Sequence, residues 1–126
     1  MNVPLTESIR NVAVVSHAGS GKTLLVEALA YCAGSLSAPG SIFAGTTVSD
    51  FEPEEIHRRT SLNTSVLRCS YQDRVLTLLD TPGSPSFIGE TRSALRAADG
   101  VVLVVSAASG VRSALQRIWS MVRDSG

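Results

Sequence analysis

A glycine-rich segment near the N-terminus contains the most specific chemical pattern in the chain. Residues 16–23 read SHAGSGKT, one residue away from the phosphate-loop pattern G-x-x-x-x-G-K-[ST], with Ser16 at the first glycine position. Such a loop turns successive backbone N–H groups toward an anion at the start of a helix. In the pattern, Lys22 reaches the β- and γ-phosphates of a nucleotide and the Thr23 hydroxyl binds Mg²⁺. The predicted phosphate-binding residues are His17, Ala18, Gly19, Ser20, Gly21, Lys22 and Thr23.

A second pattern, DTPG at residues 80–83, follows the apolar stretch RVLTLL. In phosphate-loop proteins an aspartate at the end of a neighbouring strand holds Mg²⁺, usually through water, and this predicts Asp80 as a metal ligand. The N–H of Gly83 is then free to bind a γ-phosphate. The D-x-x-G pattern is weak when alone, but after a phosphate loop and a predicted hairpin it favours a GTPase-type switch over a nucleotide kinase.

The hydrophobic pattern predicts the elements that must position these residues. Strands are expected at 11–15, 64–70, 74–80 and 101–105, and helices at 24–32, 87–98 and 111–122. The second and third strands form an antiparallel hairpin around a polar turn at residues 71–73. The run VVLVV at 101–105 has no alternation, as expected of a strand covered on both faces. The order of these strands and helices along the chain predicts an α/β fold whose sheet is mostly parallel.

Residues 34–63 show no sustained periodicity and are rich in Gly, Ser, Thr and Pro in their first half. An unstructured loop of this length is uncommon in a compact domain. Two interpretations remain open at this point: a disordered insertion, or a functional loop.

Length and composition indicate one soluble domain of ordinary character. The 126 residues are 44% hydrophobic and 17% charged, and eleven basic residues balance eleven acidic ones. The chain lacks the basic excess of a general nucleic-acid or membrane-surface binder. Cys32 and Cys69 are expected to be two buried thiols in a reducing compartment. The N-terminal segment has an acidic residue and no apolar core, so no signal peptide or membrane span is predicted, and a cytoplasmic location follows.

Three stretches together resemble a known family. RNVAVVSHAGSGKT, HRRTSLN and LLDTPGSPSFIGETRSALRAADGVVLVVSAASGV are similar to the G domain of translational GTPases, above all elongation factor G and its paralogous elongation-factor-G-like proteins. The resemblance runs from about Ile9 to the end. It implies a P-loop NTPase G domain over residues 1–126, with switch I at about 34–63 and switch II at about 80–92. It also implies GTP and GDP as ligands, Mg²⁺ as cofactor and the ribosome as partner.

Single residues can be compared with the family pattern. Ser61 falls at the switch threonine that binds Mg²⁺, and Thr60 takes that place if the register slips by one residue. Ser16 replaces a small Gly or Ala, and Gly19 stands where the family usually has an aspartate thought to support a monovalent cation. Ser84 stands where the family has the histidine, in D-T-P-G-H, that positions the attacking water. The resemblance therefore implies weakened hydrolysis.

Ser84 and Pro85 also read as an N-cap followed by proline at the first helical position. The Ser84 hydroxyl is then expected to bond a backbone N–H two or three residues later and to face away from a γ-phosphate. A serine has no pKa near neutrality, so Ser84 is not expected to replace the missing histidine.

Guanine selectivity in this family comes from N-K-x-D after the next strand and from a Ser-Ala pair later still, and the resemblance implies that both positions fall after residue 126. The chain is therefore expected to be the front part of a longer G domain that stops before the guanine-specificity strand. The preference for GTP over ATP comes from the resemblance alone. Two alternatives remain: a nucleotide-binding module that does not hydrolyse, and an adenine-nucleotide P-loop ATPase or kinase.

Overall fold

The structure is a computed structural model that describes residues 5–126. The first four residues of the N-terminal segment, for which no signal peptide is predicted, lie outside the described part. Four strands and four α-helices occur within residues 5–126, together with two single-turn 3₁₀ helices. In chain order they are η1 (Thr6–Ser8), β1 (Ile9–Val15), α1 (Lys22–Cys32), α2 (Pro53–Arg58), β2 (Ser65–Tyr71), β3 (Arg74–Asp80), η2 (Pro85–Phe87), α3 (Ile88–Ala97), β4 (Gly100–Leu103) and α4 (Ser113–Asp124).

The strands form one sheet in the order β2-β3-β1-β4. β1 is parallel to β3 and β4, whereas β2 and β3 are antiparallel. The predicted mostly parallel sheet with one antiparallel hairpin is confirmed. The hairpin turns at Gln72 and Asp73, both with positive φ (46° and 61°), the conformation that matches the right-handed twist of two paired strands.

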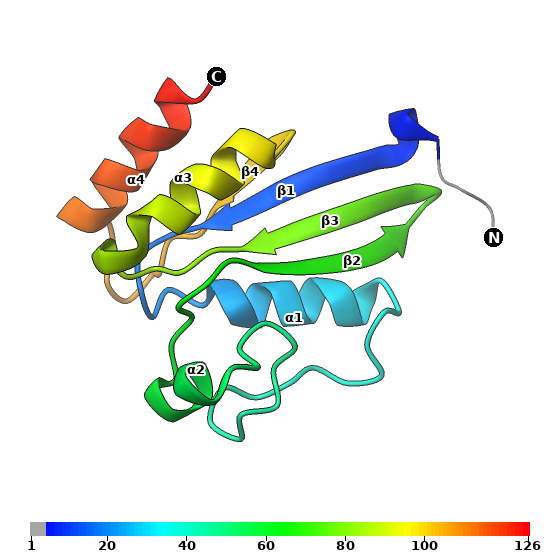
Figure 1. Cartoon of the computed structure of the whole chain (residues 1–126), viewed down its shortest axis with the longest axis horizontal. Coiled ribbons are helices and arrows are strands. Elements are labelled where there is room, and N and C mark those ends of the chain that lie inside the picture. The colour runs from blue at the N-terminus through cyan, green and yellow to red at the C-terminus, as the bar shows by residue number, and fades with distance from the viewer. Residues whose placement is uncertain (1–4) are drawn as a thin grey trace.

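Helices cover both faces of the sheet (Figure 1), because alternate residues of each strand point to opposite sides. On β1, Ala13 and Val15 pack with residues of α3 and α4, and the intervening Val14 packs with Val26 of α1. All three strand residues are fully buried. β1 and β3 thus lie at the centre of a three-layer fold, and both predicted phosphate-site segments follow directly from their carboxyl ends.

The expectation that residues 101–105 are covered on both faces is wrong for this structure. β4 lies at the edge of the sheet, and Val102 and Val105 remain 38% and 48% exposed. Within the described chain no strand pairs with the outer edge of β4, which explains the exposure. Trp119 of α4 lies beside this edge and is half exposed. The helix predicted at 111–122 begins at Ser113, so Val111 precedes it.

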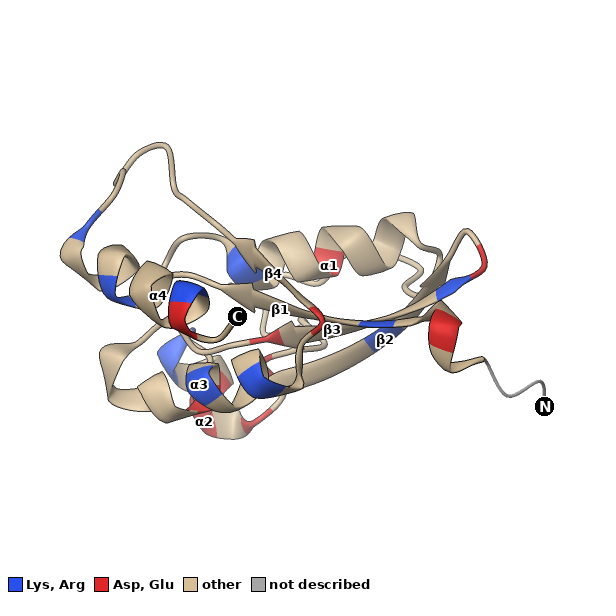
Figure 2. Ribbon diagram, turned by 90° about the horizontal axis from the view of Figure 1, so that it is seen from above, with Lys and Arg blue, Asp and Glu red and all other residues tan. Residues whose placement is uncertain are grey.

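The expectation of two buried thiols is also only half right. Cys69 of β2 is buried against α1, but Cys32, the last residue of α1, is exposed. Lys, Arg, Asp and Glu residues are spread over the whole ribbon (Figure 2), in keeping with their equal numbers. None of the helices in the described part of the chain combines the length and the apolar character that crossing a bilayer requires.

Residues 34–63 are folded as a covering segment beside α1 (Figure 1), and they contain the short helix α2, which the sequence pattern did not predict. The helix has a capping box between Glu52 and Glu55, and Pro53 occupies its first turn. Six residues are too few to show helical periodicity. The stretch Glu-Pro-Glu-Glu was nevertheless a usable start signal.

Candidate nucleotide-binding site

The phosphate loop has the backbone conformation that its glycines allow. Gly19 and Gly21 have φ values of 75° and 95°, in the left-handed region that residues with a Cβ rarely adopt. Gly21 is the N-cap residue of α1, and Lys22 is the first residue of the helix. The loop therefore ends at a helix N-terminus, where unpaired N–H groups and the helix dipole favour an anion.

Two side chains attach the start of this loop to the segment after β4. The Ser16 hydroxyl donates to the carbonyl oxygen of Val104, and the Nε2 atom of His17 lies 3.1 Å from Oγ of Ser109. The Nδ1 atom of His17 is also 2.7 Å from the carbonyl oxygen of Ala18. The buried imidazole thus anchors the loop, and both of its ring nitrogens are engaged by protein groups.

Lys22 lies across the loop from which it emerges. Its Nζ donates to the carbonyl oxygen of His17 at 3.1 Å, and the side chain is only 6% exposed. Burial lowers the pKa of Lys22, and the carboxylates of Asp80 and Asp50 act in the opposite direction. A buried ammonium held over an anion cradle is arranged to meet a concentrated negative charge.

Gly83 packs directly onto the phosphate loop, although about sixty residues separate them in sequence. A Cβ at Gly83 would lie 2.5 Å from the carbonyl C of His17, 2.6 Å from Nζ of Lys22 and closer still to the backbone N of Ala18. Such distances are far below van der Waals contact. Only glycine fits here, and Gly83 lines one cavity together with the phosphate loop.

Three oxygen-bearing side chains predicted as metal ligands also lie close together. The Thr23 hydroxyl donates to Oδ2 of Asp80 at 2.8 Å, and Oγ of Ser61 lies 3.5 Å from Oγ1 of Thr23. The second carboxylate oxygen, Oδ1 of Asp80, is buried and has no hydrogen-bond partner within the described chain. Burial raises the pKa of Asp80, and the neighbouring hydroxyls of Thr23 and Ser49 and the charge of Lys22 partly offset this rise. A set of hard oxygen donors with one unpaired carboxylate oxygen fits Mg²⁺.

Asp50 is a site residue that the sequence reasoning missed. It lines the same cavity, is 4% exposed, and its Oδ1 atom is buried without a partner among residues 5–126. Burial raises its pKa, whereas Ser61 and Lys22 lower it. No periodicity or motif marked Asp50, because its position depends on how residues 34–63 fold against α1. Thr60, the alternative to Ser61, lines the cavity too, but it is Ser61 that approaches Thr23.

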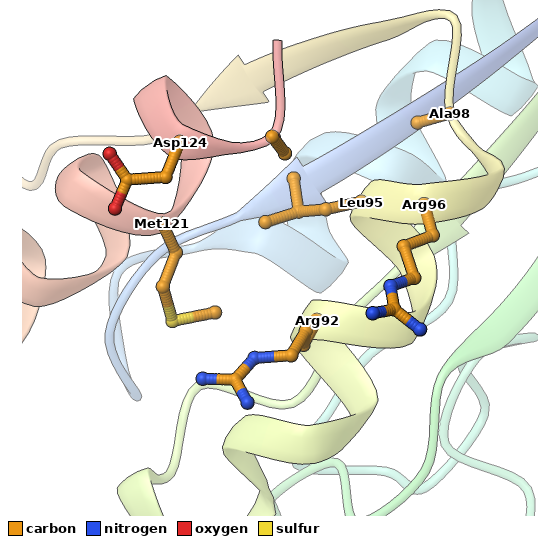
Figure 3. A pocket seen from close by; sticks show the side chains of 7 residues that line it. Arg92, Leu95, Arg96, Ala98, Met121 and Asp124 are labelled. Atoms are coloured by element: carbon orange, nitrogen blue, oxygen red, sulfur yellow. The ribbon is translucent and has the colours of Figure 1, made fainter.

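The cavity at the phosphate loop is narrow. Its volume is about 80 Å³, well below the roughly 300 Å³ or more of typical small-molecule sites. A larger hollow of about 500 Å³ lies between α3 and α4, with Arg92 and Arg96 at its edge (Figure 3). That hollow contains no part of the phosphate loop. The chemistry favours the smaller cavity as the nucleotide-phosphate site.

Ser84 lies just after the cavity-lining glycine and does not line the cavity itself. It is the N-cap of η2, its hydroxyl accepts from the N–H of Ser86 at 3.4 Å, and Pro85 follows at the first helical position. The predicted cap geometry is confirmed. The hydroxyl is engaged by its own helix, two residues along the chain.

A phosphate loop between a strand and a helix, joined to a DTPG segment at the end of the neighbouring parallel strand, defines a P-loop nucleotide-binding domain of the GTPase type. The sequence profile of the family described as elongation factor Tu GTP binding domain matches residues 7–126. The chain belongs to this family of elongation-factor GTP-binding domains.

Relatives and solved structures agree with this membership. Residues of the chain are 43% identical, over 111 positions and 88% of its length, to an elongation factor G-like protein of Mycobacterium tuberculosis. They are 46% identical, over 107 positions and 85% of its length, to an elongation factor G-like protein of Synechocystis. A crystal structure from Thermus thermophilus superposes over 93% of the chain with a TM-score of 0.88 and 43% identity. The chain spans 16% of the length of these two relatives and 18% of that structure.

Proposed function

We propose that the chain forms the nucleotide-phosphate and Mg²⁺ part of a translational GTPase similar to elongation factor G. In this proposal it binds GTP with Mg²⁺ and hydrolyses it to GDP at a reduced rate, in the cytoplasm and with the ribosome as partner. The observation that supports it most directly is the 2.8 Å hydrogen bond between Thr23 and Asp80, beside the unpaired Oδ1 atom of Asp80.

Each part of the site has a separate task in this proposal. The backbone N–H groups of residues 17–23 hold the β-phosphate, and Lys22 neutralises the β- and γ-phosphates. The N–H of Gly83 binds the γ-phosphate from the opposite side. Thr23, Ser61 and Asp80 hold Mg²⁺ directly or through water, and the ion would neutralise charge that develops on the phosphate oxygens during transfer.

The reduced rate follows from Ser84. Its hydroxyl has no pKa near neutrality and caps η2, so it cannot orient or deprotonate an attacking water as a histidine would. Loss of such a group typically lowers a rate by about 10²–10⁴. The bound GTP state of the protein is therefore long-lived, while binding itself needs no group from this position.

A nucleotide-binding module that does not hydrolyse remains the second candidate, and the side chain of Ser84 favours it. It differs from a slow GTPase only in single-turnover hydrolysis, which is then absent. An adenine-nucleotide ATPase is distinguished by competition, since ATP would then displace a labelled GTP analogue at a similar concentration.

Calorimetric titration of GTP, a non-hydrolysable GTP analogue, GDP and ATP, each with and without Mg²⁺, tests the proposal. Lys22→Ala removes the buried cation that faces the phosphates, and we expect it to abolish binding, because losing such a partner costs about 2–5 kcal/mol. Arg68→Ala, on the exposed side of β2, removes a positive charge outside the site and serves as the control. Unchanged affinity in Lys22→Ala would show that residues 16–23 do not cradle phosphate.

A further inference from the structure

A buried carboxylate on α1 lies outside every role described so far. Glu27 is 1% exposed, and its hydrogen-bond partners within the described chain are two backbone N–H groups. The N–H of Gly40 donates to Oε2 at 2.7 Å, and the N–H of Val48 donates to Oε1 at 2.5 Å. An ionised carboxylate is costly to bury unless its oxygens are hydrogen-bonded, so this arrangement defines a specific attachment point.

The attachment point lies on the same face of α1 as the metal-site threonine. Thr23 and Glu27 are four residues apart, which places them one above the other on a helix, and both are buried. Val48 precedes Asp50 by two residues, and Asp50 lines the nucleotide cavity. Glu27 therefore links the helix that starts at the phosphate loop to the segment that closes over it.

A second buried carboxylate, Glu55 of α2, organises the far end of this segment locally. Oε1 of Glu55 accepts from the N–H of Leu62 at 2.9 Å and from the N–H of Asn63 at 3.2 Å. These bonds hold the chain directly after Ser61. The segment between the two carboxylates is also tightly folded, because a Cβ on Gly40 would lie 2.6 Å from the Cα of Thr47. Glu27 thus attaches the segment to α1, and Glu55 ties α2 to the chain directly after Ser61.

We propose that Glu27 is a positioning residue that holds residues 40–61 closed over the nucleotide site and so places Ser61 beside Thr23. This inference rests on the proposed GTP-binding function, and it adds how that site is assembled. The Glu27 contacts affect the triphosphate state, in which Ser61 and the closed segment meet the γ-phosphate and Mg²⁺. The diphosphate state depends chiefly on the phosphate loop, to which Glu27 makes no hydrogen bond within the described chain.

The isosteric variant Glu27→Gln distinguishes this role from simple packing. In the wild type each carboxylate oxygen accepts one hydrogen bond, whereas an amide accepts on one side and presents N–H donors on the other. One of the two loop N–H groups would then face an amide N–H and lose its bond, although the side-chain volume is unchanged. We expect about tenfold weaker binding of a non-hydrolysable GTP analogue with Mg²⁺, and GDP affinity within about twofold of wild type.

Hydrogen exchange gives a second readout that needs no nucleotide. Exchange of the Gly40 and Val48 amides should be faster in Glu27→Gln than in wild type. Glu54→Gln, an exposed glutamate of α2 that pairs with Arg58, is the matched control and should change neither exchange nor nucleotide affinity. Gly40→Ala disturbs the same contact from the loop side and should give the same loss for the GTP analogue alone.

Equal losses for GDP and the GTP analogue, or wild-type affinity for both together with unchanged exchange at Gly40 and Val48, would overturn the role of Glu27. If wild type binds neither nucleotide, the proposed function fails instead. Amide exchange in that case still decides whether Glu27 holds the segment closed.

Discussion

Replacing Gly83 by alanine would add one methyl group at the closest contact between the two halves of the site. The new Cβ would lie 2.5 Å from the carbonyl C of His17 and closer still to the backbone N of Ala18. Ordinary contact begins near 3.4 Å, so the two segments must separate by about 1 Å. Because these opposing atoms are backbone, a change of side-chain rotamer cannot relieve the overlap.

The separation has two expected consequences for Gly83→Ala. Overpacking of this kind costs about 1–3 kcal/mol of folding free energy, which chemical denaturation of the nucleotide-free protein measures. The N–H of residue 83 also moves away from the proposed γ-phosphate position. A misplacement of about 1 Å can lower a rate by roughly 10², so single-turnover GTP hydrolysis should fall by about this factor, with a smaller loss of GDP affinity.

Gly89→Ala is the matched control for this substitution. Gly89 lies in the first turn of α3, and a Cβ there meets no atom within 4 Å. Alanine at this position should leave nucleotide binding unchanged and stabilise the helix by up to about 1 kcal/mol. The reasoning is refuted if Gly83→Ala unfolds at the same denaturant concentration as wild type and binds the GTP analogue equally well.

Three further predictions concern other parts of the chain. Ser84→His should raise single-turnover hydrolysis by about 10²–10⁴ without tightening GTP binding, and an ordinary translational-GTPase rate already present in wild type would contradict the role assigned to Ser84. Burial raises the pKa of Asp80 in the folded state, so the associated stability is fully present below the unfolded pKa and is lost as pH rises through the folded pKa. Asp80→Asn should therefore raise the Tm of the metal-free protein at neutral pH and abolish the added stability from Mg²⁺ with nucleotide, whereas Asp73→Asn in the exposed hairpin turn should do neither. The outer edge of β4, which pairs with no strand among residues 5–126, and the exposed Val102 should cause self-association at high concentration. Light scattering would detect this association, and Val102→Lys should reduce it; a monomeric wild type at high concentration would show that this edge is inert.

The sequence alone determined the fold class and the phosphate loop. Strand and helix periods of about 2 and 3.6 residues are local properties, and they located every strand of the described chain to within about two residues. The loop could be read directly as well, because glycines at 19 and 21 meet a backbone requirement that few other residues satisfy. The Ser84–Pro85 cap was predictable for the same reason, since a cap concerns neighbours in sequence.

Tertiary structure decided the closed part of the site. Asp50 and Glu27 are acidic residues without a motif, and their burial follows from the path of residues 34–63 across α1. The same folding brought Ser61 rather than Thr60 next to Thr23, and it left one face of β4 exposed where the apolar run suggested cover. Such contacts join residues that are roughly 20 to 60 positions apart. They depend on which buried polar groups find partners in three dimensions, and a pattern along the chain does not contain that information.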